Sequence, residues 1–276
     1  MALPDPPSLA AMHRILSRHL GDEDRYTIHP GDLSWWLYHH DRRRVAPEIR
    51  VGEDAIAVLH GHEGEVDVFG GDARIDLFDA VRDDAHASVA GVSESDTTLI
   101  RALEQRGLAP AGDADVTFVR GVSPLGATVP DGYEVRALAG EEEAWARRAA
   151  SHAAFESTQA PDDHLARYLS FMRSPVYVPE RDLVAVTPDG TVGSFLIWWG
   201  DEATGIAQLE PVGTHPAHQR RGLAAAVFDR ALADMRAAGM TRVRVETGEG
   251  RPGAIAFYRS VGLEPFHRLQ WWKPAP

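Results

Sequence analysis

The chain has 276 residues and a formal net charge of −13, because 41 acidic side chains outnumber 28 basic ones, and it contains no cysteine. The missing thiol excludes disulfides, thiolate metal sites and a cysteine nucleophile. The acidic balance disfavours a nucleic-acid partner, and no apolar stretch approaches the roughly 18 residues that span a membrane, so we expect no membrane partner either.

Two local features agree with these exclusions. The only dense basic run is Arg42, Arg43 and Arg44, which we interpret as a solvated loop. The amino-terminal sequence lacks a basic segment followed by an uninterrupted apolar one, which is the pattern of a secretory signal. We therefore expect a cytoplasmic protein.

The length predicts two domains, because a single hydrophobic core stops growing at about 250 to 300 residues. A stretch rich in proline and glycine, residues 123–132, separates two segments that each begin a new alternation of helices and strands. We predict a first domain over residues 1–122, a linker over 123–131 and a second domain over 132–276.

Apolar periodicity predicts the elements of each half. The first half has predicted helices over residues 7–20 and 97–106 and strands over 49–51, 55–59 and 65–69. The second half has predicted helices over residues 141–155 and 161–172, then helices that begin near residues 220 and 252 and end at Gly239 and Gly262. Its predicted strands cover residues 133–137, 183–186, 192–199, 206–212, 242–245 and 269–272. The fold class is therefore α/β.

The ends of the two halves resemble each other. The segment LIRALEQRGLAP at residues 99–110 aligns with AIAFYRSVGLEP at residues 254–265, so that Gly107 falls on Gly262 and Leu103 falls on Tyr258. Both segments have the pattern of a helix, a glycine stop and a following turn. The alignment predicts an internal repeat.

The strongest chemical signal is LEPVGTHPAHQRRGLAAAVFDRAL, residues 209–232, which predicts a strand, a short loop and a helix. The start of a helix leaves backbone N–H groups unpaired and carries a partial positive charge, which suits a pyrophosphate. Gly222 and Ala224 keep side chains away, while Arg220 and Arg221 add charge. The alternative is a helix start packed on a sheet with its arginines in solvent.

At these residues the chain resembles the GNAT superfamily of N-acetyltransferases, whose motif is Gln/Arg-x-x-Gly-x-Gly/Ala after the fourth strand. Gln219, Gly222 and Ala224 match the motif, and the resemblance extends over residues 132–276 to a closing Ala-x-x-x-Tyr-x-x-x-Gly-Leu element. It implies a tandem bacterial type with two GNAT-like domains. Each would be a mixed, mostly antiparallel, splayed sheet flanked by helices.

The resemblance implies acetyl-CoA as cosubstrate, lying where the fourth and fifth strands splay apart. Pro211 agrees with a splayed strand, because proline tolerates a strand only at an edge or a bulge. The implied contacts come from the strand end and the helix start, namely Val212, Gly213, Thr214, Gln219, Arg220, Arg221, Gly222, Leu223, Ala224 and Ala225.

Transfer to an amine requires the neutral amine, which at a pKa near ~10.4 is only about one part in 2,500 at pH 7. Glu210 resembles the strand-borne glutamate that serves as general base in many GNAT enzymes, and is otherwise a surface carboxylate or a binder of a cationic substrate. Tyr258 resembles the tyrosine that protonates the departing thiolate, and is otherwise a core aromatic. We expect direct transfer in a ternary complex.

The acceptor pocket is less defined by the sequence. The resemblance implies walls from the first two helices of the second half and the end of its third strand, where Phe155 and Trp198 would lie. Ordinary burial explains both aromatics as well. We predict no metal site, because the histidine pairs that begin at His60 and His215 lack a recognisable third ligand.

We expect an N-acetyltransferase acting on a primary amine of a small molecule or peptide. Two alternatives stay open, an acyl-CoA-binding sensor or pseudoenzyme without turnover and a tandem synthase that acetylates a cysteinyl-sugar thiol precursor. The presence of both Glu210 and Tyr258 favours an enzyme. The first half has no phosphate motif and carries Leu103 in place of the tyrosine, so we expect a degenerate copy that acts as a scaffold. The oligomeric state is open, a homodimer included.

Overall fold

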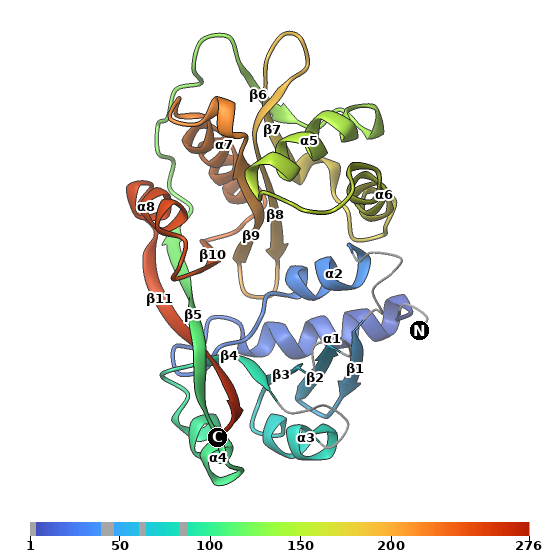
Figure 1. The fold of residues 1–276 in the computed structure, drawn as a ribbon, viewed down its shortest axis with the longest axis vertical. Coiled ribbons are helices and arrows are strands. Elements are labelled where there is room, and N and C mark those ends of the chain that lie inside the picture. Colours follow the sequence, from blue (N-terminus) through green and yellow to red (C-terminus); the bar gives the residue numbers. More distant parts are fainter. Residues whose placement is uncertain (1–3, 40–46, 61–64, 83–87, 276) are drawn as a thin grey trace. The chain divides into compact units, whose positions relative to one another are not determined.

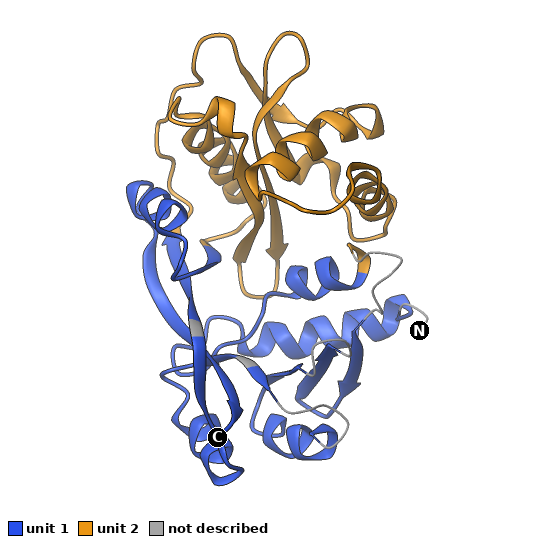
Figure 2. Ribbon diagram, in the orientation of Figure 1, with its two compact units in different colours: residues 1–37, 44–120, 244–276 blue, residues 38–43, 121–243 orange. Residues whose placement is uncertain are grey.

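The computed structural model describes residues 4–39, 47–60, 65–82 and 88–275 (Figure 1). Contacts between residues divide the chain into two compact units (Figure 2). Unit 1 comprises residues 1–37, 44–120 and 244–276, and unit 2 comprises residues 38–43 and 121–243. The basic triplet Arg42, Arg43 and Arg44 lies outside the described residues. Within the described ranges, no helix is long and apolar enough to cross a membrane.

Unit 2 is an antiparallel sheet with helices on both faces. Its strands lie in the order β9-β8-β7-β6, with bounds β6 Glu134–Ala137, β7 Asp182–Val186, β8 Val192–Asp201 and β9 Ile206–Thr214. One face is covered by α7 (Leu223–Ala237), and the other by α5 (Ala144–Ala154) and α6 (Pro161–Met172). Three short 3-10 turns complete the unit, at Glu141–Glu143, Pro179–Arg181 and Pro216–His218.

The sequence of β8 reflects this position between two helical layers. Residues 192–199 are all buried, and a strand covered on both faces has a continuous apolar run rather than an alternation. On one face Phe195 packs beneath the Arg147 guanidinium of α5, which lies 3.8 Å from the ring centroid. The other face receives the helical stripe that the spacing predicts, and α7 buries Leu223, Val227, Ala231, Leu232 and Met235.

Unit 1 contains two sheets. The first is antiparallel in the order β1-β2-β3, with bounds β1 Glu48–Val51, β2 Ala55–His60 and β3 Glu65–Gly70. The second has the order β4-β11-β5-β10, with bounds β4 Val89–Ser93, β5 Leu108–Gly121, β10 Arg242–Gly248 and β11 Glu264–Pro274. The helices of the unit are α1 Pro6–His19, α2 Pro30–Tyr38, α3 Arg74–Val81, α4 Thr97–Gln105 and α8 Pro252–Ser260.

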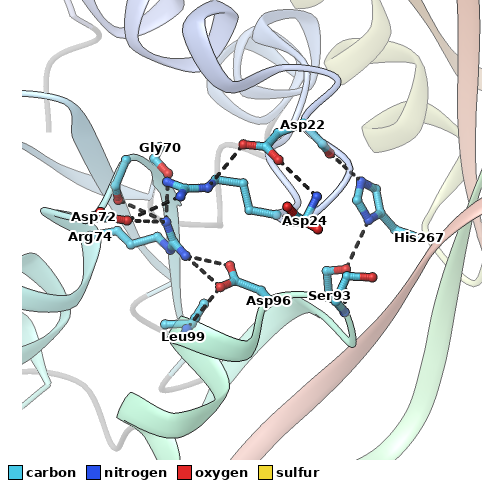
Figure 3. A network of polar contacts seen from close by, with 12 residues as sticks. Asp22, Asp24, Gly70, Asp72, Arg74, Ser93, Asp96, Leu99 and His267 are labelled. Carbon is cyan, nitrogen blue, oxygen red and sulfur yellow. Dashed lines mark hydrogen bonds and ion pairs between the residues drawn. The ribbon is translucent and has the colours of Figure 1, made fainter.

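One hydrophobic core holds the two sheets of unit 1 together. Buried side chains of β2, β3 and β4 meet those of α3 and α4, and Trp272 of β11 joins the same cluster. Beside this core lies a buried polar network (Figure 3). Arg74 donates to both carboxylate oxygens of Asp96 at 2.8 and 2.6 Å, and Asp96 caps α4 by accepting the Leu99 N–H at 3.0 Å. The network therefore fixes the start of α4 against α3.

The predicted repeat is present in unit 1. Both α4 and α8 end at a glycine in the left-handed conformation, Gly107 at φ +76° and Gly262 at φ +78°, and each is followed by a strand. Leu103 and Tyr258 are buried at the equivalent helical position. The strand after the second copy, β11, pairs antiparallel with both β4 and β5.

This pairing explains why the compact units do not follow the two predicted halves. Residues 244–276 belong to unit 1 because β11 lies between β4 and β5. The boundary at residues 123–131 stays a prediction. That stretch has no regular secondary structure, and the backbone N–H groups of Leu125 and Ala127 donate to Asp229 of α7 at 2.6 and 2.9 Å.

The structure also contains elements that the periodicity did not predict, namely α2, α3, β4 and β5. The sequence of β5 includes Pro110 and Gly112 and has the composition of a loop, yet pairing with β11 along most of its length makes it a strand. The helix predicted to begin near residue 220 begins at Leu223, because Arg220 and Gly222 adopt positive φ values of +63° and +82°.

Candidate functional site

A β-bulge interrupts β9 at the predicted catalytic position. Leu196 of β8 pairs with Val212 and Trp198 pairs with Leu209, so Glu210 and Pro211 together oppose a single residue of β8. The peptide bond between them is cis. Proline has no N–H for the ladder, and a bulge is one of the places where a strand tolerates it. The bulge accounts for Pro211 within the strand, and the splay of the fourth and fifth strands stays a prediction.

Glu210 lies directly before this bulge. Gln208, two residues earlier, pairs with Trp199, whose ring meets Phe171 of α6 at a centroid distance of 5.7 Å. Side chains alternate along a strand, so Glu210 shares the face of Gln208, the one that α5 and α6 cover. Its side chain is partly exposed and follows the buried Leu209.

Gly213 lies after the bulge, and its lack of a side chain is a packing requirement. The ring of Phe195 occupies the space that a Cβ at this position would take. Ser194 Oγ donates to the Gly213 carbonyl at 2.9 Å and lies 3.0 Å from Thr214 Oγ1. The end of β9 is therefore held against β8 by side chains as well as by the ladder.

The loop after β9 is fixed by its own polar side chains. Tyr133 is the centre of this arrangement, because its hydroxyl lies 2.7 Å from His218 Nδ1 and accepts Arg221 Nη1 at 3.0 Å. His215 Nδ1 accepts the Ala217 N–H at 3.1 Å. These contacts give His215 and His218 structural roles in the turn.

The start of α7 presents backbone donors without a side-chain cap. Gly222 is the N-cap residue and no side chain caps the helix, so the first N–H groups have no intrahelical acceptor. Arg220 and Arg221 are exposed beside them, while Leu223 is buried and anchors the first turn. Ala224 and Ala225 are partly exposed, and Gln219 Nε2 donates to the Thr214 carbonyl at 3.4 Å. Unpaired amides, a positive helix end and two arginines form a site suited to a phosphate group.

Comparison with protein families matches residues 142–263 to the acetyltransferase (GNAT) family. The chain contains a GNAT acetyltransferase domain. No curated protein gives a significant match. The domain includes the bulged strand, the glycine turn and the uncapped helix start described above.

Solved structures extend this similarity to the whole chain. The GCN5-related N-acetyltransferase from Sphaerobacter thermophilus is 20% identical, with 99% of this chain and 96% of that chain covered and a TM-score of 0.62. A tandem GNAT protein from the clavulanic acid biosynthesis pathway is 15% identical, with coverage of 99% and 96% and a TM-score of 0.67. A GNAT-family acetyltransferase from Colwellia psychrerythraea is 12% identical, with 96% of each chain covered and a TM-score of 0.64. At these identities the comparison shows the fold alone, which this chain shares with these GNAT structures over nearly its full length.

The predicted site residues of the GNAT domain fall in both compact units. Glu210, the residues from Val212 to Thr214 and the α7 start lie in unit 2, whereas Tyr258 lies on α8 in unit 1. Tyr258 is buried, and its ring packs against Phe118 at a centroid distance of 5.8 Å. Its role as a proton donor stays a prediction.

The two predicted pocket aromatics of the GNAT domain lie on different faces of the sheet. Phe155, at the end of α5, is exposed and meets Phe195 at a centroid distance of 6.0 Å. Trp198 points to the other face of β8, where the guanidinium of Arg181 lies 4.3 Å from its ring centroid. The structure does not bring Phe155 and Trp198 together. Phe155 contacts Phe195 of β8, and Trp198, three residues further along the same strand, faces the opposite way.

Sequence reasoning missed a buried ionic cluster beneath α5. Asp182 is fully buried and accepts Arg147 Nε at 3.2 Å, the Tyr177 hydroxyl at 3.3 Å and the Tyr168 hydroxyl. Burial, followed by the charge of Asp182, raises the pKa of both tyrosines above the ordinary value. The cluster holds α5 and α6 on the sheet, and no motif in the sequence predicts it.

A second group that the sequence did not single out lies in unit 1. Three side chains each offer one atom that could bind a metal ion, and these atoms lie within 4.8 Å of one another: His60, Glu65 and Asp67. His60 Nε2 lies 3.1 Å from Asp67 Oδ2. The sequence suggested only His62 as a neighbour of His60, and His62 lies outside the described residues. Pairing of β2 with β3 brings His60 opposite Glu65, which spacing along the chain does not reveal.

Proposed function

We propose that the chain is an acetyl-CoA-dependent N-acetyltransferase for a primary amine of a small molecule or peptide. The observation that carries the proposal is the uncapped start of α7, which follows a bulged strand with a carboxylate at the bulge. The loop between β9 and α7 therefore has a helix start suited to phosphate at one end and a strand with a carboxylate suited to acid–base chemistry at the other. The GNAT domain supports the acyltransferase class, and the acceptor and the acetyl group are the proposed part.

The helix start would hold the coenzyme. Backbone N–H groups of Leu223, Ala224 and Ala225 have no partners within the helix and would donate to the pyrophosphate. Arg220 and Arg221 are exposed and would add charge-assisted contacts in a protein whose net charge is −13. The backbone from Val212 to Thr214 would bind the pantetheine arm.

The chemical step would be a direct transfer. Glu210 removes one proton from the acceptor ammonium, and the neutral nitrogen attacks the thioester carbonyl. The carbon–sulfur bond then breaks as the amide forms, and the nitrogen releases its second proton to solvent. The departing thiolate takes a proton from the hydroxyl of Tyr258. Glu210 then releases its proton to solvent, and Tyr258 regains one. In this proposal the degenerate first half binds no coenzyme and acts as a scaffold.

The test measures free thiol released from acetyl-CoA in the presence of a panel of primary amines. Since the chain has no cysteine, every new thiol comes from coenzyme A. Glu210→Gln is expected to lower kcat by about 10² to 10⁴. Tyr258→Phe is expected to lower kcat while calorimetry shows unchanged affinity for coenzyme A. Glu202→Gln changes an exposed carboxylate in the loop before β9 and is the matched control, with activity expected to stay unchanged.

Two outcomes would overturn the proposal. Tight binding of acetyl-CoA without thiol release from any amine would indicate a sensor. A thiol acceptor consumes one thiol for each one released, so mass spectrometry of the product would identify a thioester product and an S-acetyltransferase instead.

A further inference from the structure

Arg148 of α5 is a buried cation, and two of its three side-chain nitrogens form no hydrogen bond with the described residues. Arg148 is only 4% exposed. Its Nε and Nη2 are buried and make no hydrogen bond to any residue that the structure describes. A buried donor without a partner carries a desolvation penalty, and the penalty is greater for a charged group. Within unit 2, these two nitrogens have no hydrogen-bond acceptor among the described residues.

The preceding arginine shows the contrast. Arg147 pairs with the fully buried Asp182 and stacks on Phe195, so its position is explained by the ionic cluster beneath α5. Successive side chains on a helix point about 100° apart, so Arg148 faces away from that cluster. Two adjacent arginines are thus buried for different reasons.

The two unpartnered atoms define one edge of the guanidinium. Nε–H and one Nη2–H point in the same direction and are spaced to donate to both oxygens of a carboxylate. One face of the group is taken by Trp145, whose ring centroid lies 4.8 Å from Cζ. Stacking fixes the plane of the guanidinium and leaves the edge for recognition, which is the arrangement that favours Arg for planar anions.

The charge of Arg148 acts on a histidine of α6. His164 Nδ1 is buried and has no hydrogen-bond partner among the described residues. Burial and the charges of Arg148 and Arg167 lower the pKa of His164 to about 4. Asp162 is the carboxylate whose charge acts on Arg148, and it forms no ion pair with it among the described residues. His164 is therefore neutral near pH 7, and the positive charge at this position comes from Arg148 and Arg167.

The position of α5 relates this edge to the proposed reaction. The helix packs on β8 and β9, and Phe155 at its end contacts Phe195, the residue that covers Gly213. This is the face of the sheet toward which Glu210 points. An anion held by α5 would therefore lie on the same side of unit 2 as the proposed base.

We propose that the Nε and Nη2 edge of Arg148 binds a carboxylate of the acceptor, so that the acceptor is an amine that also carries a carboxylate. The inference rests on the proposed function and narrows its substrate class to amino acids and related amino carboxylates. Both nitrogens are covered in the free protein, so binding displaces the side chains over them.

The test uses a matched series of small probes on the full chain. Omega-amino acids of two to six carbons are compared by titration with the corresponding alkylamines, which lack the carboxylate, the corresponding carboxylic acids, which lack the amine, and inorganic phosphate. Binding is followed by nuclear magnetic resonance and by Trp fluorescence, with Trp145→Phe identifying the contribution of the stacked indole. We expect the amino acids and carboxylic acids to bind and the alkylamines to bind at least tenfold more weakly.

The variants are Arg148→Gln, Arg148→Lys and the control Arg173→Gln, an exposed arginine at the end of α6 that pairs with Glu141. Arg148→Gln is expected to weaken carboxylate binding at least tenfold. Arg148→Lys is expected to bind carboxylates almost as weakly, because lysine lacks the paired N–H donors of the guanidinium. Arg173→Gln is expected to change nothing. The melting temperature of the free protein is expected to stay equal or rise in Arg148→Gln, whereas a purely structural arginine would lower it.

The outcomes separate this inference from the proposed function. Carboxylate binding that depends on Arg148, without thiol release from acetyl-CoA, would support the site and refute the acetyltransferase. Acetylation of omega-amino acids with the same KM in wild type and Arg148→Gln would refute the site and leave the acetyltransferase intact. Stronger binding of phosphate than of carboxylates, or no binding of any probe, would overturn the inference.

Discussion

The ring of Phe195 lies directly over Gly213, so two neighbouring strands of unit 2 meet where no Cβ fits. Phe195 is fully buried beneath Arg147 of α5 and has no room to move aside. Close packing of this kind resists added volume, because a single methyl forces side chains from their rotamers. The position of the proposed pantetheine strand thus depends on a glycine that serves packing.

Gly213→Ala is expected to lower the free energy of unfolding by about 1 to 3 kcal/mol, the usual effect of overpacking. Urea unfolding measures this change. The matched control is Gly253→Ala in α8, where nothing lies within 4 Å of the added Cβ, and it is expected to be neutral or stabilising. In the double variant with Phe195→Leu the two effects should be less than additive. Full additivity would show that the overlap is relieved elsewhere.

Gly222→Ala is expected to weaken binding of coenzyme A, because Gly222 holds φ at +82° at the start of α7. An L residue in that conformation costs about 1 to 2 kcal/mol, and relaxing it would turn the first amides of the helix. Gly190→Ala, with φ +86° in the turn before β8, has the same backbone strain away from α7. Both variants should lose similar stability in urea, but calorimetry should detect weaker coenzyme binding for Gly222→Ala alone. Equal affinities would refute the assigned role of the helix start.

Asp96→Ala is expected to destabilise the protein by about 3 to 5 kcal/mol, because it leaves the buried Arg74 without its carboxylate partner and removes the cap of α4 (Figure 3). Asp79→Ala removes the carboxylate that pairs with Arg106 at the surface and is expected to change stability by about 0 to 1 kcal/mol. Chemical denaturation of both variants compares a buried with an exposed pair of the same chemistry. Similar losses for both would mean that burial does not determine the energy here.

Glu246 gives unit 1 a pH dependence. Burial raises the pKa of its carboxyl from 4.5 to about 7, against the hydrogen bond that Tyr26 donates at 2.5 Å. The folded protein therefore holds a proton between these pH values that the unfolded chain has released, so the contribution of Glu246 to stability is greatest below pH 4.5 and falls as pH rises to 7. The full shift corresponds to roughly 3 kcal/mol, which partial solvent exposure reduces.

Glu246→Gln is expected to remove this fall, and urea unfolding of both proteins at several pH values between 4.5 and 7 measures it. His267 acts in the opposite direction, because burial lowers its pKa to about 4 and its stabilising effect is lost as pH falls below 6.5. That effect is common to both proteins and cancels in the difference. Parallel pH profiles of wild type and variant would contradict the assignment.

Several elements were predictable because their local signals agree with their surroundings. The helix over residues 161–172 has the predicted bounds, since proline at its first position and an amphipathic stripe both favour it. The repeat was visible because Gly107 and Gly262 each end a helix in a conformation that glycine adopts without strain. The missing N–H of Pro211 predicted a strand edge or a bulge, and the structure has a bulge there.

Other features depend on partners that are distant in the sequence. The composition of β5 favours a loop, and only pairing with β11 makes it a strand. The buried ionic cluster at Asp182 requires α5, α6 and β7 to meet, and the unpartnered edge of Arg148 becomes recognisable only when burial is known. Trp198 and Phe155 were placed together by their position in the chain, although strand alternation separates them.

The sequence by itself determined the GNAT motif, the repeat, most elements of unit 2 and the residue types at the proposed site, because these depend on backbone conformation and local periodicity. Only the tertiary structure decided that residues 244–276 join unit 1 and that Phe195 covers Gly213. It also decided that Nε and Nη2 of the buried Arg148 have no hydrogen-bond partner in the part of the chain that the structure describes. These features arise from strand pairing and side-chain packing between distant segments. Their energies depend on which surfaces meet, and a one-dimensional pattern does not contain that information.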